Sequence, residues 1–203
     1  MPVLTAILSA ALLAQASASP TPRAEPVPAQ SAPLTLTMRF AGREGERPIP
    51  FEVAKGVVVF KVKIAGRDVW AGLDNGAQGS LIDQTFAKEA GLRIGPPEGD
   101  IVTLTGSVPK RRVSNVPLSI PGAFEAEVPA LAAMDLSAVS KIVGKKIDFV
   151  FGADFFNITT VMVDASRGMM RIGPRGSARL PPTIPVFTVV GEQPHIEATI
   201  NGE

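Results

Sequence analysis

The sequence predicts an all-β domain built from short strands that tight turns connect. The 203 residues include 19 glycines and 19 prolines, a share that favours turns over long helices. β-Branched runs bounded by turn residues, of which Gly56–Ile64 is the clearest, are typical of strands. Hydrophobic residues make up 45% of the chain, enough for a buried core. The length fits one domain, or one domain and part of a second.

Composition excludes several classes of function. The net charge is +1 and the longest basic run is Lys110–Arg112, so there is no electrostatic case for a nucleic-acid partner. The absence of cysteine excludes a thiol nucleophile, a disulfide framework and a thiolate metal site. His195 has no His or Cys companions and no Gly-x-Ser-x-Gly elbow accompanies it. We therefore expect no metal and no cofactor.

The first residues predict an export signal. Val3–Ala16 is apolar and ends in Ala-x-Ala triplets, but it is shorter than the roughly 20 residues that span a bilayer. We expect residues 1–18 to be a signal peptide and the protein to be exported to a bacterial periplasm or extracellular space, with no stable membrane span. The missing positive charge before the run leaves a disordered tail or a misplaced start as the alternative. Residues 19–33 are rich in Pro and Ala and predict a linker.

Four extended segments are expected before the most informative stretch of the chain. Residues 34–40 alternate in polarity, and residues 48–53 carry prolines that predict an edge strand. Strands at 57–64 and 68–73 follow, joined by a glycine turn. Trp70, the single tryptophan, is interpreted as a core or barrel-surface aromatic.

An acidic residue follows the fourth segment directly. Asp74 lies on a glycine-bearing turn at the end of an apolar strand, where a carboxylate is held rigidly beside backbone N–H groups. Taken alone, Asp-Asn-Gly is more commonly a plain hairpin turn. Asp83 then predicts the N-cap of a short helix that ends near Ala90, with Phe86 and Ala90 facing inward and Gly91 at the left-handed position after it.

The second half of the chain predicts further strands. In order, we expect a Pro/Gly loop at 93–100, a strand at 101–105, a polar tip at 106–112, strands at 113–120 and 124–131, a loop at 132–146 with a helical turn near 136–139, and a strand at 147–151.

Three landmarks occur together in a characteristic order. The first is Leu73–Ala77 followed by Ser80-Leu81-Ile82, and the second is Phe149–Gly152 followed by a short helix at 153–156. The third is a closing hairpin at 160–172. Over residues 48–173 the sequence resembles the retropepsin-like aspartic protease family in its bacterial secreted form.

This resemblance implies an all-β acid-protease closed barrel with one or two short helices, occupying residues 34–182. It implies that the hairpin near residue 106 is a flap that closes over substrate, with a surface hairpin of no function as the alternative. The implied site residues are Asp74 as the catalytic carboxylate, Asn75, Gly76 and Ala77 as support of the active turn, Thr105, Gly106, Ser107 and Val108 in the flap, and Val150, Phe151 and Gly152 in the late apolar-glycine motif.

The implied activity is that of an aspartic endopeptidase acting on peptides or proteins. Its chemistry needs two carboxylates that share one proton, one acting as general base on a water and the other polarising the scissile carbonyl. Asp74 supplies one, and the partner Asp comes from a second copy or a second lobe. Ile196–Glu203 repeats the pattern of Phe60–Arg67, which places a second Asp at about position 210. Residues 183–203 are accordingly expected to begin a truncated second lobe.

One departure from the family pattern supports a second hypothesis. Asn75 stands where the family carries Thr or Ser, and a buried amide without a partner would cost about 1–3 kcal/mol. Together with the missing partner Asp, this leaves a non-catalytic retropepsin-like binding or scaffold module as the alternative function.

Overall fold

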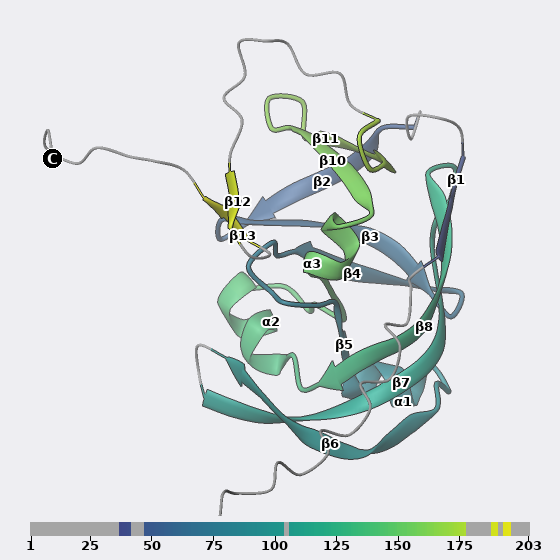
Figure 1. The fold of residues 1–203 in the computed structure, drawn as a ribbon, viewed down its shortest axis with the longest axis vertical. Coiled ribbons are helices and arrows are strands. Elements are labelled where there is room, and N and C mark those ends of the chain that lie inside the picture. The colour runs from purple at the N-terminus through teal and green to yellow at the C-terminus, as the bar shows by residue number, and fades with distance from the viewer. Residues whose placement is uncertain (1–36, 42–46, 104–105, 178–187, 191–192, 196–203) are drawn as a thin grey trace, which may run out of the picture. The chain divides into compact units, whose positions relative to one another are not determined.

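The computed structural model describes residues 37–41, 47–103, 106–177, 188–190 and 193–195 (Figure 1). All of them belong to one compact unit, Leu34–Glu203. The expected signal peptide and linker lie outside the described residues, as does most of the expected start of a second lobe. No helix within the described ranges is long and apolar enough to cross a membrane.

Strands dominate the described chain. In order, the elements are β1 (Thr37–Phe40), β2 (Ile49–Ala54), β3 (Val57–Ile64), β4 (Arg67–Leu73), β5 (Leu81–Asp83), α1 (Gln84–Glu89), β6 (Ile94–Thr103), β7 (Gly106–Ile120), β8 (Phe124–Met134), α2 (Ser137–Val143), β9 (Phe149–Phe151), α3 (Ala153–Phe156), β10 (Thr159–Asp164), β11 (Met169–Pro174), β12 (Thr188–Val190) and β13 (Gln193–His195).

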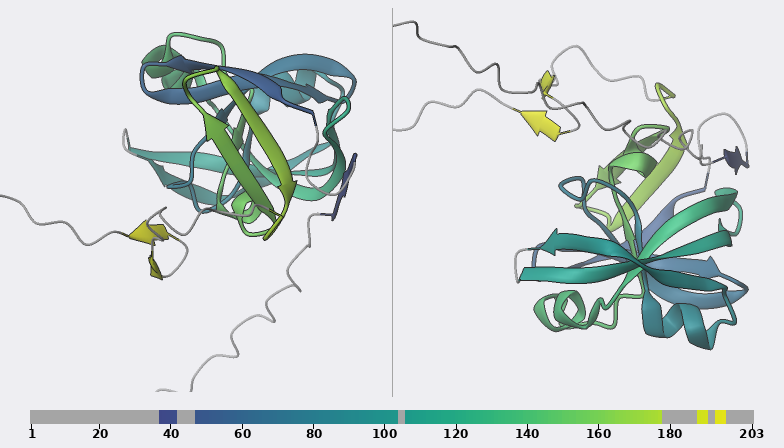
Figure 2. Two further views of the ribbon diagram at one scale, coloured as in Figure 1. Left: turned by 90° about the horizontal axis from the view of Figure 1, so that it is seen from above. Right: turned by 60° about the horizontal axis from the view of Figure 1, so that its bottom comes forward.

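The central sheet closes on itself, which confirms the predicted barrel. Its strand order runs β3-β4-β9-β5-β8-β7, and β7 pairs again with β3 at Lys63 and Ile64. Two of these pairings, β4 with β9 and β5 with β8, are parallel and the others are antiparallel. The hairpin of β10 and β11, drawn in light green, extends the sheet beyond this ring by pairing with β2 (Figures 1 and 2).

The barrel interior is filled by the inward-facing residues of these strands. In β3 the alternation is clear, because Phe60, Val62 and Ile64 are buried while Lys61 is exposed. The ring of Phe151 lies between those of Phe60 and Phe155, at centroid distances of 5.5 and 4.3 Å. Aromatic contacts of this kind stabilise the fold beyond the contribution of the area that each ring buries. The late aromatic segment is thereby anchored to the first half of the barrel.

The predicted first helix is confirmed as α1, with its N-cap as expected. The Asp83 carboxylate accepts the Phe86 N–H at 2.8 Å and the Leu136 N–H at 3.0 Å, so it also joins α1 to the segment before α2. Phe86 is buried and Ala90 is half-buried, and Gly91 takes the left-handed conformation.

Replacing Asp83 with Ala should therefore lower the free energy of unfolding by more than the loss of an N-cap at the surface would. The change removes the cap of α1 and leaves the buried Leu136 N–H without its acceptor, so we expect a loss of roughly 2–4 kcal/mol in the free energy of unfolding. Urea denaturation measures it. Asp135→Ala is the matched control, since the exposed Asp135 accepts the N–H of Ser137, two residues ahead, and forms no hydrogen bond or ion pair with a distant segment among the described residues. Equal losses in the two variants would contradict the bridging role of Asp83.

Two predictions about the flap region were wrong. The expected loop at 93–100 is strand β6 from Ile94 onward, and residues 106–112 begin β7 rather than forming a polar tip. β6 lies at the sheet edge, and its register with β7 shifts on both sides of Pro97. Bulges at an edge accommodate prolines that would interrupt a central strand. The pairing of β6 with β7 accordingly extends to Thr103 and Gly106.

The basic residues assigned to that tip lie in the strand. Arg111 is half-buried and donates to the Gly95 carbonyl oxygen at 3.2 Å, and Arg112 pairs with Glu98 at 3.1 Å. Both side chains therefore hold β6 against β7.

The edge position predicted for β2 was also wrong. β2 pairs with β11 at Ile49 and Pro50 and with β3 from Phe51 onward. Each half of β2 has a partner on one side only, which is how proline is accommodated inside the sheet.

The remaining predictions agree in type and differ in length. The expected helical turn near 136–139 is the longer α2, and the expected strand at 124–131 extends to Met134. The closing hairpin is confirmed by β10 and β11. His195 lies in β13, which pairs only with β12 among the described strands.

Candidate active site

Asp74 lies on the turn that follows β4, and backbone hydrogen bonds hold the turn from both sides. Its N–H donates to the Phe151 carbonyl oxygen at 3.0 Å, and its carbonyl oxygen accepts the Ala77 N–H at 3.2 Å. The carboxylate Oδ1 accepts the Gly76 N–H at 3.0 Å. Asp74 is exposed, so a rigid turn presents a carboxylate to solvent.

The late apolar-glycine motif lies directly beside this turn. β9 runs parallel to β4, with Val150 opposite Gly72 and Phe151 opposite Leu73. Val150 and Phe151 are both buried. The structure thus brings the first two sequence landmarks together, and their roles in catalysis stay a prediction.

Gly152 allows two backbone segments to touch. A Cβ at Gly152 would collide with the backbone of Gly79, whose Cα would lie only 2.9 Å from it. The φ angle of Gly152 is −108°, which any residue can adopt, so the requirement for glycine is steric. The prediction of a close backbone approach at Gly152 is confirmed, and its partner is the active loop.

A serine and an aspartate lock the same contact, and sequence reasoning missed this network. The Ser80 hydroxyl accepts the Gly152 N–H at 3.1 Å and donates to Asp154 Oδ1 at 2.6 Å. The Ser80 N–H donates to the same oxygen at 2.8 Å. The Ala153 N–H also donates to the Ala77 carbonyl oxygen at 2.9 Å. The available signal was the small polar residue after the Asp74 turn, but nothing local points to Asp154 as its partner.

Asn75 is exposed and forms no hydrogen bond with any described residue. The expected cost of a buried, unmatched amide therefore does not arise within this lobe. Its donor and acceptor are both available to a second lobe or a second copy.

The predicted flap residues lie at the β6–β7 turn. Gly106 and Ser107 are exposed, and the Ser107 hydroxyl donates to Asp100 at 3.1 Å. Val108 packs against a buried cluster that includes Val150, which connects the base of this hairpin to the late motif. Val102, 86% exposed, lies just before the turn. Thr105 lies outside the described residues.

A buried carboxylate precedes β9 and is not part of the Asp74 turn. Asp148 precedes β9, is buried, and lies 3.2 Å from the Lys146 ammonium group. Burial raises the pKa of Asp148, against the opposing effect of Lys146. The hydrogen bond to Asp148 raises the pKa of Lys146 in turn. Among the described residues, no cluster of three or more His, Asp or Glu side chains could hold a metal ion.

The raised pKa of Asp148 predicts a pH-dependent stability difference. The folded state holds this proton more tightly than the unfolded state does, so Asp148 contributes most below its ordinary value of 3.8 and less as the pH rises through the folded value. Asp148→Asn removes this dependence. The free energy of unfolding of the variant relative to wild type should therefore rise between pH 3 and pH 7.

Asp164→Asn is a control for which the expected change of stability with pH has the opposite sign. Hydrogen bonds from Ser166 lower the pKa of the exposed Asp164, so the relative stability of that variant should fall over the same pH range. Chemical denaturation at several pH values measures both variants. Parallel pH dependence of the two would contradict the assignment for Asp148.

Comparison with known proteins adds to this geometry. Residues 60–155, which include the Asp74 turn and the late motif, match the family model described as aspartyl protease. The match fits one lobe of a retropepsin-like aspartyl protease. Members of the family act on peptides and often dimerise. No curated protein matches the sequence.

Solved structures similar to the aspartyl protease lobe have low identity to it. The EIAV protease in complex with the inhibitor HBY-793 is 16% identical with a TM-score of 0.37, covering 49% of this chain and 84% of that one. The retroviral protease-like domain of Ddi1 from Leishmania major is 16% identical with a TM-score of 0.40, covering 66% and 100%. A retropepsin-like aspartic protease from Rickettsia conorii is 9% identical with a TM-score of 0.41, covering 68% and 90%. Similarity at this level carries no argument about activity.

Proposed function

We propose that this lobe is half of an aspartic endopeptidase and that Asp74 is its dyad carboxylate. The observation that carries the proposal is the turn itself, in which an exposed Asp74 is fixed by the Phe151 carbonyl on one side and by the Gly76 N–H on the other. Catalytic groups need such rigid placement, because small displacements are costly in rate.

A second Asp completes the chemistry, supplied by a second copy of the chain or by a second lobe. An exposed turn can face its symmetry mate across a two-fold axis. Two carboxylates a few ångströms apart cannot both ionise readily, so the pair holds one proton. Asn75 lies beside Asp74, where its amide can donate and accept across such an interface.

The reaction follows from this shared proton. The ionised carboxylate takes a proton from water as the water oxygen adds to the scissile carbonyl carbon, and the protonated carboxyl donates to the carbonyl oxygen. Collapse of the tetrahedral intermediate breaks the C–N bond, and the amine leaves with a proton from the dyad. An extended peptide would lie between the β6–β7 turn and the Asp74 turn.

The location of the protein is a separate part of the proposal. The apolar run in residues 3–16 and the Ala-x-Ala triplets after it support export to the periplasm or the extracellular space. Fractionation followed by N-terminal sequencing of the mature protein tests it. A cytoplasmic protein that retains its first residues would contradict export.

Concentration dependence tests the endopeptidase proposal directly. If two copies form the dyad, specific activity on an unfolded protein substrate should rise with enzyme concentration between pH 3 and pH 7, in step with dimer formation measured by light scattering. A pepstatin-type inhibitor should suppress the activity. A stable monomer that cleaves nothing, alone or mixed with a lobe that carries a second Asp, would favour the non-catalytic binding module instead.

A further inference from the structure

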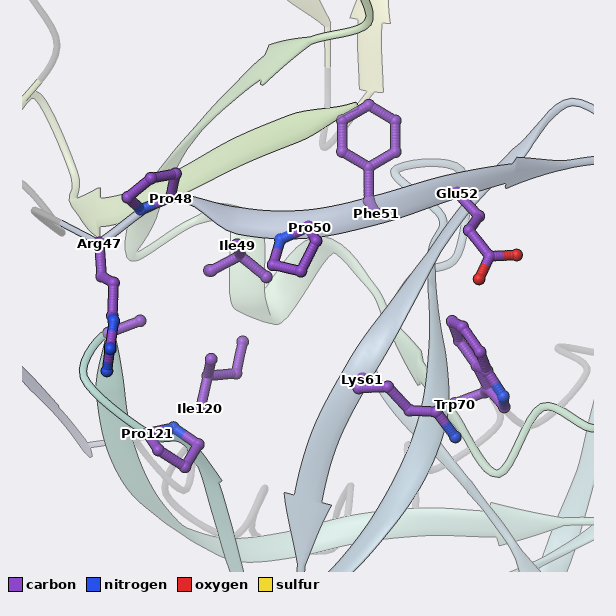
Figure 3. Close-up of a pocket in the computed structure, with 11 residues that line it drawn as sticks. Arg47, Pro48, Ile49, Pro50, Phe51, Glu52, Lys61, Trp70, Ile120 and Pro121 are labelled. Atoms are coloured by element: carbon purple, nitrogen blue, oxygen red, sulfur yellow. The ribbon is translucent and has the colours of Figure 1, made fainter. Parts of the chain in front are cut away.

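A groove on the barrel surface shares no residue with the Asp74 turn. It has a volume of about 310 Å³, within the range of ligand sites, and lies between β2 and the turn that joins β7 to β8 (Figure 3). Ile49 on β2 and Ile120 at the end of β7 face each other across it. Its lining also includes the apolar residues Pro48, Pro50, Pro121 and Trp70.

The sheet topology creates this groove. β2 pairs with β3 only from Phe51 onward, and its first residues turn away to pair with β11. β3 pairs with β7 only at Lys63 and Ile64. β4 pairs with the other edge of β3, so at Lys61 this edge is paired with neither β2 nor β7, and the groove opens there. Three of the residues that line it are prolines, whose rings have little conformational freedom.

Two positive charges that have no carboxylate partner among the described residues stand on opposite sides of the apolar centre. Arg47 lies across Gly122, with its Cδ and Nη1 atoms 2.8 Å from where a Cβ of that glycine would be. On the other side, the Lys61 ammonium lies 4.2 Å from the centroid of the Trp70 ring. Neither cation forms an ion pair with a described carboxylate.

The single carboxylate in the groove wall is already neutralised. Glu52 forms an ion pair with Lys145 at 2.6 Å, and the Lys145 ammonium also lies 3.6 Å from the Trp70 ring. The Glu52 charge is therefore not available to Lys61. The electrostatic character of the groove is that of its two free cations.

We propose that this groove binds an extended peptide segment with an apolar centre and an acidic residue on each side. Two separated cations match a ligand with two anionic ends, whereas a single-headed anion such as a fatty acid satisfies only one. The apolar walls suit the side chains between the two acidic residues. The site is distinct from the Asp74 turn, so it would hold a partner or a remote part of a substrate whether or not the lobe is catalytic.

The single tryptophan makes the proposal testable without any activity. The probe is acetyl-Glu-Ile-Val-Ile-Glu-amide, added to the full chain carrying Asp74→Asn so that no cleavage occurs. Trp70 emission should change saturably with probe concentration, and a dye-labelled copy of the probe should show the same affinity by polarisation. The isosteric Gln-Ile-Val-Ile-Gln peptide should bind about fivefold or more weakly, and added salt should reduce the difference.

Two variants locate the binding. Arg47→Gln and Lys61→Gln should each weaken binding of the labelled acidic probe by about two- to fivefold, the effect of one exposed ion pair. Lys88→Gln, on the exposed side of α1 and outside the groove, is the matched control and should change nothing.

Several outcomes would overturn the inference. They are the absence of saturable binding, equal affinity for the acidic and Gln probes, and equal affinity of the Arg47, Lys61 and Lys88 variants. A change in Trp70 emission on adding octanoate, with no change on adding the peptide, would assign the groove to a single-headed amphiphile instead.

Discussion

Asp74→Asn is expected to reduce proteolysis by a factor of roughly 10³ or more, because a single proton-transferring group contributes about 10²–10⁴ and the dyad acts as a unit. The Asn side-chain oxygen can still accept the Gly76 N–H, so the turn should keep its shape. Cleavage of an unfolded protein substrate at acidic pH measures the loss, and circular dichroism verifies the fold. Activity equal to wild type would exclude Asp74 as a dyad member.

Asp135→Asn is the matched control for this substitution. Asp135 is also an exposed carboxylate that accepts the N–H two residues ahead, from Ser137 at 2.8 Å. Asp135 lies outside the Asp74 turn, so its replacement should leave proteolysis unchanged. Equal loss in both variants would point to a general effect of charge rather than to Asp74.

Gly152→Ala is expected to have the largest effect on stability. The added methyl group would overlap the Gly79 backbone, and a backbone atom cannot move aside as a flexible side chain can. Overpacking of this kind costs about 3 kcal/mol or more. Moving the two segments apart would also stretch the hydrogen bond that the Gly152 N–H donates to Ser80 and the one that Ser80 donates to Asp154. Any proteolytic activity should therefore fall with the stability. Urea denaturation and the same cleavage assay measure the two effects.

Gly79→Ala tests the other side of the same contact. A Cβ at Gly79 would have no atom within 4 Å, so this variant should unfold within about 1 kcal/mol of wild type. If Gly79→Ala lowered the free energy of unfolding strongly and Gly152→Ala lowered it little, the close approach at Gly152 would not be the source of the expected destabilisation.

Short-range features of the chain were predictable because their causes are local. Asp83 precedes a short helical pattern that ends at a glycine, and the same residues cap and end α1 in the structure. A carboxylate two residues before a glycine at a strand end forms its own turn, as Asp74 does with Gly76. The order of the landmarks was sufficient to predict the barrel and the family.

Features that depend on partners distant in sequence were decided only by the tertiary structure. Residues 93–100 carry the composition of a loop, yet β7 provides a strand for them to pair with, and bulges accommodate their prolines. The prolines of β2 suggested an edge, but β3 and β11 each pair with a different half of that strand. Both errors arose because strand pairing depends on what lies alongside, which the composition of a segment does not contain.

The residues that hold the Asp74 turn in place also divide into those predictable from local sequence and those decided by the tertiary structure. The sequence by itself determined that Asp74 stands on a glycine turn after an apolar strand. That Ser80 binds Asp154, 74 residues away, was decided by the barrel, which brings α3 against the active loop. The surface groove also required the fold, since it exists only where β2 and β7 separate on either side of Lys61. Local chemistry determines which residues can act, whereas packing between distant segments determines how they are held.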